Sequence, residues 1–259
     1  MSSPTPQEFA RPSKGRIGAE VLLVLGVSLG ASAVYSLVNI VDLSTRKTSL
    51  SHQSAALNTS LSNRPTFDVI YQFLGLFFDV VPVALVAFLL WRAAKPHLGR
   101  LGLDFDHPWK DLGVGALLAL VIGAGGIGVY LGGRALGITV NVSADGLSSY
   151  WWTIPILLLS ALRAALQEEI IVIGYLFARL RELGWNKWWI ILATSILRGS
   201  YHLYQGFGAF IGNFAMGMLF GWLYSRYGRV LPLVVAHFLI DAAIFVGYSW
   251  AASAFPNLF

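Results

Sequence analysis

Residues 151–180 read WWTIPILLLSALRAALQEEIIVIGYLFARL, an apolar stretch long enough to cross a lipid bilayer that nevertheless carries two adjacent glutamates. A charged side chain at membrane depth costs several kcal/mol unless it faces protein, water or a charged partner. An adjacent pair of such residues therefore indicates a functional centre. We predict that Glu168 and Glu169 form this centre, and that polar residues of neighbouring spans reach them.

The composition of the whole chain indicates a membrane protein. Of its 259 residues, 56% are hydrophobic and only 12% are charged, about half the charged share of an ordinary soluble domain. The formal net charge is +5, but the Lys and Arg residues lie mainly in short loops between apolar segments, so we expect no nucleic-acid partner. The chain has no cysteine, which excludes disulfides and a cysteine nucleophile.

Seven mostly apolar segments are candidate membrane spans, each near the length of about 20 residues that a helix needs to cross a bilayer. They are 17–41, 67–91, 111–132, 150–178, 187–204, 207–225 and 229–250. The predicted fold class is therefore all-α, a polytopic transmembrane helical bundle of about seven spans. We see no internal repeat. Between the first two spans, residues 42–66 are rich in Ser, Asn and Thr and are expected to form a solvated, irregular loop.

The distribution of basic residues predicts the topology. With a cytosolic N-terminus, most Lys and Arg residues outside the spans fall on the cytosolic side, as the positive-inside rule requires. We therefore expect a multi-pass protein of the cell membrane, with the lipid bilayer as its partner. The predicted parts are a disordered cytosolic tail at 1–16, N-terminal transmembrane helices at 17–148, a helical core at 149–250 and a C-terminal tail at 251–259.

Polar residues inside the predicted spans are few and follow helical spacing. Three pairs lie four residues apart, so that each shares one helix face: Arg163 with Gln167, Arg198 with His202, and His237 with Asp241. Asp79 is a further intramembrane carboxylate, which we interpret as a group that bridges helices.

The two adjacent glutamates cannot both point into one site. Neighbouring residues of an α-helix project about 100° apart, so only one carboxylate aims straight at a given target. The other is expected to pair with a base, either Arg198 or Arg163. A buried carboxylate beside imidazoles can take a proton from water, while the histidines bind a metal, orient the water or stabilise an oxyanion. This combination predicts a hydrolase, although the same groups can also simply join helices by hydrogen bonds.

Three motifs follow one another on successive spans. Glu168-Glu169 is followed by Gly174-Tyr175-Leu176, then by His202, and finally by His237-x-x-x-Asp241. In this order they resemble the CPBP family of intramembrane metalloproteases, also called Abi, which includes CAAX-type prenyl endopeptidases and bacteriocin-processing enzymes. The resemblance covers about residues 150–245 and implies that the helical core at 149–250 is catalytic.

The resemblance implies an intramembrane endopeptidase that hydrolyses peptide bonds of membrane-associated proteins or peptides, with CAAX-type prenylated substrates as one case. Glu168 would act with His202 to activate the attacking water. His237 and Asp241 would hold a metal or stabilise the oxyanion. Two chemistries stay open: a zinc ion held by His202, His237 and Glu168, or a metal-free glutamate mechanism. The candidate catalytic set is Glu168, Glu169, Arg198, His202, His237 and Asp241.

Two positions depart from the motifs of that family. Ile173 stands where the family has an arginine after Glu-Glu, and Arg198 stands where it has a phenylalanine before the histidine. We hypothesise that Arg198, one helical turn before His202, supplies the charge that Ile173 cannot.

Two other classes of function remain in view. A non-catalytic membrane scaffold is suggested by Ile173, since loss of the arginine can mean loss of activity. A proton-coupled transporter also uses intramembrane Glu, Asp, His and Arg residues. The absence of inverted repeats and of paired broken helices in two halves argues against the transporter.

Overall fold

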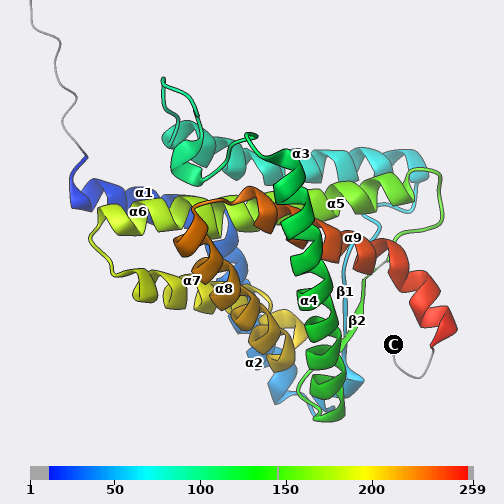
Figure 1. Cartoon of the computed structure of the whole chain (residues 1–259). Coiled ribbons are helices and arrows are strands. Elements are labelled where there is room, and N and C mark those ends of the chain that lie inside the picture. The colour runs from blue at the N-terminus through cyan, green and yellow to red at the C-terminus, as the bar shows by residue number, and fades with distance from the viewer. Residues whose placement is uncertain (1–11, 145, 256–259) are drawn as a thin grey trace, which may run out of the picture.

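A computed structural model describes residues 12–144 and 146–255, which form a mostly helical molecule (Figure 1). The α-helices are α1 (Lys14–Gly26), α2 (Leu29–Thr45), α3 (Pro65–Leu89), α4 (Pro108–Ala135), α5 (Thr153–Glu168), α6 (Leu176–Glu182), α7 (Lys187–Tyr201), α8 (Phe207–Tyr227) and α9 (Leu231–Ala254). The shorter elements are η1 (Leu50–His52), β1 (Ser54–Ala56), η2 (Gly99–Leu101), β2 (Asn141–Ser143), the π-helix η3 (Glu169–Tyr175) and η4 (Leu203–Gln205).

The all-α class and the presence of several membrane helices are confirmed, but the predicted number of spans is too high. Within the described residues, α3, α4, α8 and α9 are each long and apolar enough to cross a membrane, and the bent pair α1 and α2 would add a fifth. The segment predicted at 150–178 is divided by η3 and carries several charges, whereas 187–204 contains only the 15 residues of α7. A helix of that length is shorter than a bilayer crossing requires.

The first predicted span, 17–41, is broken where α1 meets α2. The two helices differ in direction by 57°. At the bend the Ser28 hydroxyl donates to the carbonyl oxygen of Val24 at 2.6 Å, and a Cβ on Gly30 would lie 2.7 Å from the carbonyl oxygen of Leu25. The close approach of the chain therefore requires a glycine, and α2 takes a direction of its own.

The predicted boundaries of both tails also change. Of the N-terminal tail, residues 1–11 lie outside the described part, but α1 already begins at Lys14 and not after residue 16. The Ser13 side chain caps it by accepting a hydrogen bond from the Arg16 backbone N–H. At the other end α9 continues to Ala254, so the predicted tail at 251–259 starts inside a helix, and 256–259 lie outside the described residues.

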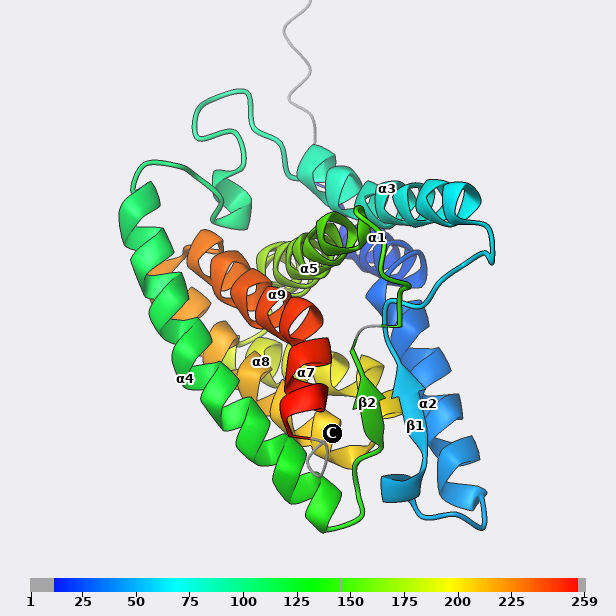
Figure 2. The ribbon, with the colours of Figure 1, turned by 90° about the vertical axis from the view of Figure 1, so that its right-hand side faces the viewer.

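The central element is the rod formed by α5, η3 and α6. Figure 2 shows α5 between α3 and α9, and contacts join α5 to both of these helices. α7 packs on α8 and on α2, while α4 packs along α9. All seven residues of η3 are buried, so the glutamate pair lies at the start of the best-shielded part of the rod.

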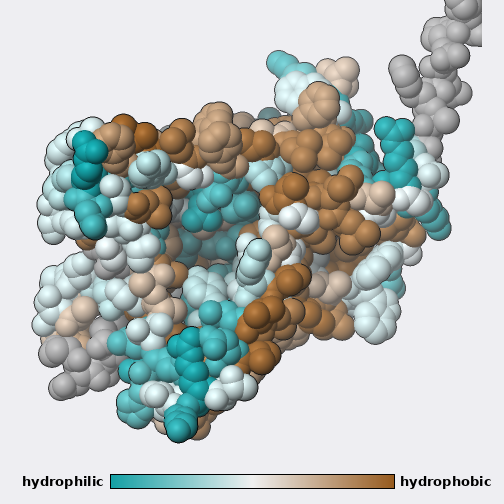
Figure 3. All heavy atoms as spheres, turned by 180° about the vertical axis from the view of Figure 1, so that it is seen from behind, coloured by the Kyte–Doolittle hydropathy of each residue, from teal (hydrophilic) through white to brown (hydrophobic). Residues whose placement is uncertain are grey.

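The outer surface of several helices is apolar, as expected for side chains that face lipid. On α3 the side chains of Phe77, Phe78 and Phe88 are each more than 60% exposed. Hydrophobic residues, drawn in brown, cover much of the face seen from behind (Figure 3). Large exposed apolar patches of this kind are typical of a membrane-embedded surface.

The loop predicted at 42–66 is not wholly irregular. Its β1 pairs in parallel with β2, with Ser54 opposite Asn141 (Figure 2). Just before β2, the Val140 backbone N–H donates to the carbonyl oxygen of Gln205 in η4 at 3.2 Å. The small sheet therefore ties the loops after α2 and α4 to the segment that follows α7.

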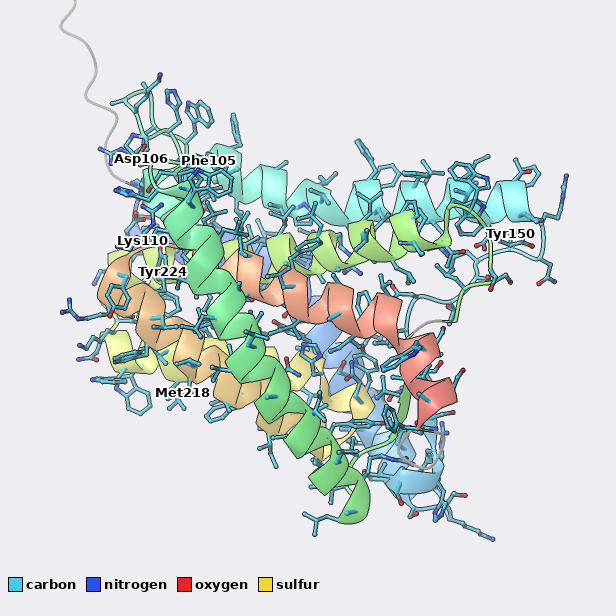
Figure 4. All side chains as sticks on the ribbon, turned by 45° about the vertical axis from the view of Figure 1, so that its right-hand side comes forward. Phe105, Asp106, Lys110, Tyr150, Met218 and Tyr224 are labelled. Carbon is cyan, nitrogen blue, oxygen red and sulfur yellow. The ribbon has the colours of Figure 1, made fainter. Side chains whose placement is uncertain are left out.

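At the opposite end, charged groups join the start of α4 to the start of α9. Arg229 donates to Asp111 through Nε at 2.9 Å and to Asp104 through Nη1 at 3.0 Å. Hydrogen bonds to Asp111 raise the pKa of Arg229 above its usual value, despite partial burial. Partial burial raises the pKa of Asp104, but hydrogen bonds from the Asp106 backbone N–H and from Arg229 outweigh it and leave this pKa lowered. The labelled Asp106 stands at this end in Figure 4.

The same end requires a close backbone approach. Gly102 adopts a left-handed conformation with φ of +67°, and a Cβ there would lie only 2.3 Å from the carbonyl oxygen of Gly228. The Gly102 carbonyl oxygen accepts a hydrogen bond from the Val230 backbone N–H at 2.8 Å. The turn before α4 and the turn before α9 are therefore in direct contact.

Candidate active site

Glu168 lines a cavity of about 510 Å³ between α2 and the helices α5 and α7. Its Oε2 accepts a hydrogen bond from the Tyr201 hydroxyl at 2.8 Å and lies 3.7 Å from Nε2 of His202. Seen from behind, the molecule is hollowed beside its apolar surface, and hydrophilic side chains colour the hollow teal (Figure 3). The other lining residues are Leu29, Ser32, Tyr35, Ser36, Asn39, Arg163, Gln167 and Tyr204.

Glu169 points away from the cavity, into a buried network of charged groups. Its Oε1 contacts both Nη2 of Arg198 and Nδ1 of His237, the latter at 2.7 Å. Nε2 of His237 lies 3.4 Å from Oδ2 of Asp241, one helical turn later. Arg198 also lies 3.8 Å from Oε2 of Glu168, so its guanidinium joins the two carboxylates.

The geometry separates the two glutamates as their spacing predicted. Glu168 ends α5 and faces the cavity, whereas Glu169 begins η3 and has no solvent exposure. In η3 the backbone N–H of Leu176 reaches the carbonyl oxygen of Ile171, five residues earlier. Such π segments are frequent at functional sites, because the change of helical pitch redirects side chains. Of the two bases considered for the second glutamate, Arg198 is the partner of Glu169.

His202 lies on the cavity side, immediately after the end of α7. Both its ring nitrogens are shielded, and neither has a hydrogen-bond partner among the described residues. A buried polar atom without a partner is costly, which favours a role for these nitrogens toward water or a substrate group. His237 and Asp241 do not line this cavity and lie behind it, on the side of Glu169.

Several cavity residues escaped the sequence analysis. Tyr201, the residue before His202, holds the Glu168 carboxylate. On α2 the polar side chains of Ser32, Ser36 and Asn39 face the cavity. Their spacing of four and three residues places them on one helix face, a signal that was available in the sequence.

One comparison with known proteins gives a match. Residues 150–243 match the family described as type II CAAX prenyl endopeptidase Rce1-like. This region is a domain of that family. Neither the curated proteins nor the solved structures contain a match to the chain.

The Rce1-like domain runs from the residues just before α5 into α9, and so contains Glu168, Glu169, Arg198, His202, His237 and Asp241. The resemblance inferred from the three motifs is thereby confirmed. The α2 wall of the cavity lies outside the matched residues. The chain therefore combines an Rce1-like core with a cavity that its own N-terminal helices complete.

Ile173, the departure from the family motif, is fully buried in the apolar core. The charge in the site comes instead from Arg198, whose side chain is also fully buried and contacts Glu169. The guanidinium carbon of Arg198 lies 5.4 Å from the centroid of the Phe220 ring, a further favourable contact for a cation. Arg198 thus occupies the place next to the glutamates that the hypothesis required.

A buried group in the Rce1-like domain has donor atoms that can hold a metal ion. Single ligand atoms of Glu168, Glu169 and His237 lie within 4.8 Å of one another. The predicted set of His202, His237 and Glu168 shares two members with this group, which has Glu169 in place of His202. Among the described residues, Oε2 of Glu169 has no hydrogen-bond partner and is available to a metal, but the Arg198 guanidinium contacts the other oxygen of the same carboxylate.

Arg198 affects whether a metal ion can bind to the group of Glu168, Glu169 and His237. A zinc ion needs ionised carboxylates for itself, whereas Arg198 already lies within 4.0 Å of both of them. A second cation would be repelled by the first in a site of low dielectric constant. The ligand atoms of Glu168, Glu169 and His237 could hold a metal ion, but the positive charge of Arg198 opposes its binding. The mechanism below therefore uses only side chains of the protein.

Proposed function

We propose that this protein is an intramembrane endopeptidase in which Glu168 and His202 activate the attacking water. The observation that carries the proposal is that these two side chains meet in a cavity inside an Rce1-like domain. The cavity has room for a peptide segment and opens beside apolar surface. Its substrates are membrane-associated proteins or peptides, and we place the N-terminus of the chain in the cytosol.

Water activation follows from the spacing of the two side chains. A water molecule about 2.8 Å from each of two polar atoms can bridge them when, as here, Oε2 of Glu168 and Nε2 of His202 are 3.7 Å apart. Glu168 accepts a proton from this water as the oxygen attacks the carbonyl carbon of the peptide bond. His202 donates a hydrogen bond to the oxyanion that forms, and the proton then passes from Glu168 to the departing amine as the C–N bond breaks.

Neighbouring groups orient the Glu168 carboxylate and stabilise its charge for this step. The Tyr201 hydroxyl fixes the orientation of the carboxylate, and the nearby Arg198 favours its ionised form. Glu169, His237 and Asp241 hold Arg198 in place from behind. In this proposal they act as positioning residues that do not touch the substrate.

The test compares wild type with Glu168→Gln and His202→Ala in detergent-purified protein. The peptide panel includes a prenylated CAAX-type peptide, because the family description names prenyl endopeptidases. Wild type should cleave at least one peptide, and both variants should lose this cleavage. Glu182→Gln is the matched control, since Glu182 pairs with Arg179 outside the cavity.

Other outcomes point to the rival functions. Cleavage that persists in Glu168→Gln rejects the mechanism. If wild type cleaves no peptide in the panel, the scaffold becomes the better explanation, and substrate-dependent proton uptake into vesicles would then identify a transporter.

A further inference from the structure

Arg163 differs from the other arginines that pack between helices in having no carboxylate within hydrogen-bond distance among the described residues. Arg179 and Arg229 each donate several hydrogen bonds to carboxylates, and Arg198 contacts Glu169. Arg163 has a long hydrogen bond of 3.4 Å from Nη1 to Oε1 of Gln167, and its shielded Nε has no hydrogen-bond partner among the described residues. Since a guanidinium has five N–H donors, this one is underused.

The nearest carboxylate does not satisfy it. Oδ2 of Asp79 lies 3.6 Å from Nε of Arg163, beyond hydrogen-bond distance, and the Asp79 side chain is 53% exposed. Ion pairs with that much exposure hold their partners weakly. Asp79 can therefore be displaced by a better-placed anion.

Arg163 also lines the cavity that contains Glu168. The two residues are five positions apart on α5, which corresponds to about 7.5 Å along a helix axis. A peptide in extended form advances about 3.3 Å per residue. One peptide can therefore place a carbonyl group beside Glu168 and an anionic group against Arg163.

We propose that Arg163 is a binding subsite for the C-terminal carboxylate of the peptide substrate, which displaces Asp79 when it binds. A guanidinium with free donors binds a carboxylate through two parallel, charge-assisted hydrogen bonds. Acidic side chains are rare at membrane depth, whereas every peptide chain has one α-carboxylate. The inference rests on the proposed function for the identity of the ligand as substrate.

The negative charge of Glu168 does not forbid this arrangement. Arg198 lies 3.8 Å from its carboxylate and the Tyr201 hydroxyl donates to it, so its charge is partly compensated from behind. Apart from Glu168 and His202, the cavity side chains around Arg163 belong to uncharged residue types, among them Gln167, Asn39 and Tyr204.

The test measures binding separately from cleavage. Full-length Glu168→Gln protein in lipid nanodiscs, which should not cleave, is titrated with a fluorescent apolar peptide as its free acid and as its C-terminal amide. The free acid should bind at least about tenfold more tightly, the effect expected of hydrogen bonds to a charged group. Adding Arg163→Gln should abolish this preference without changing the affinity for the amide.

A second variant should strengthen binding of the free acid instead of weakening it. Asp79→Asn removes the competing carboxylate and should tighten binding of the free acid while leaving the amide unchanged. A misfolded protein cannot produce this gain. Equal affinity for acid and amide, no binding of either, or a preference that survives Arg163→Gln overturns the proposal.

A third peptide identifies the source of the carboxylate. It carries a C-terminal amide after a terminal glutamate, and it should bind like the plain amide. If this peptide binds as tightly as the free acid, the assignment of the subsite to the α-carboxylate is overturned. Cleavage is measured separately, on protein that retains Glu168. If that protein cleaves no peptide, the proposed peptidase function fails, but tighter binding of the free acid than of the amide can still be observed.

Discussion

Glu169 and Arg198 form an ion pair in which neither side chain has any solvent exposure. Removal of one partner from such a pair leaves an uncompensated charge inside the protein. We therefore expect Arg198→Met to lower the free energy of unfolding by about 3–5 kcal/mol. The measurement is denaturant unfolding in detergent micelles.

The exposed pair of Arg46 with Asp42 provides the control for this variant. Its side chains are more than half exposed, so Arg46→Met should cost less than about 1 kcal/mol. Equal costs for the two variants would contradict the buried-charge argument. An Arg198→Ala protein that folds and keeps full cleavage would refute the role of Arg198 as the replacement for the missing arginine at Ile173.

Tyr201→Phe should reduce catalysis more than it reduces stability. The variant removes the hydroxyl that donates to Glu168 at 2.8 Å. A hydrogen bond to a charged group is worth about 1.5–3 kcal/mol, which predicts a loss of about tenfold or more in kcat/KM. Tyr175→Phe is the control, because the Tyr175 hydroxyl donates to Glu20 at 2.9 Å and Tyr175 does not line the cavity. Similar losses in both variants would speak against a special role for Tyr201.

Gly102→Ala should be more destabilising than Gly228→Ala. Both glycines have left-handed backbone conformations, a strain of about 1–2 kcal/mol for alanine. Only at Gly102 does the added Cβ meet another atom, the Gly228 carbonyl oxygen at 2.3 Å, whereas nothing lies within 4 Å at Gly228. The extra cost should be at least about 1 kcal/mol in the free energy of unfolding. Identical stabilities would show that the two turns do not meet.

Asp104 should stabilise the protein in a pH-dependent way. Its pKa is lowered in the folded state, where the Asp106 backbone and Arg229 donate to the carboxylate. Its contribution is therefore fully present above the ordinary aspartate pKa of about 3.9 and is lost as the pH falls through the lowered value. The difference in thermal unfolding temperature between wild type and Asp104→Asn should be constant near neutral pH and shrink below pH of about 4. A difference that grows on acidification contradicts this assignment.

A strong zinc chelator should leave cleavage unchanged. The reason is that Arg198, already in contact with both glutamates, provides the positive charge of the site. The measurement is kcat/KM before and after incubation with the chelator and dialysis. Loss of activity that returns with added zinc would instead assign a metal to the group of Glu168, Glu169 and His237.

The sequence predicted that polar residues of different helices would meet, because a charged residue in an apolar span has few tolerable environments. Glu169 and Arg198 are two such residues, and they form an ion pair. The departure at Ile173 likewise pointed to Arg198 as the compensating charge. The number of spans was less predictable, since apolar composition alone does not show where a helix ends, and α7 has only 15 residues.

Other features depend on contacts that no local pattern reveals. The π-helix η3 begins at Glu169, and no proline or glycine stands at its start to mark the change of pitch. The pairing of Ser54 with Asn141 joins segments that are far apart in the chain. The separation of His202 from the group of possible metal ligands depends on the end of α7, where the chain leaves the helix and turns toward the cavity side.

The cavity wall joins an early part of the chain to a late one: the Ser36 hydroxyl on α2 donates to the carbonyl oxygen of Tyr201 at 3.0 Å. During synthesis, α2 enters the membrane long before α7 has left the ribosome. The emerging chain thus has no enclosed site until its last third is made. A truncated product that ends before α7 would contain Glu168 but lack Tyr201 and His202, and so would lack the proposed water-activating pair.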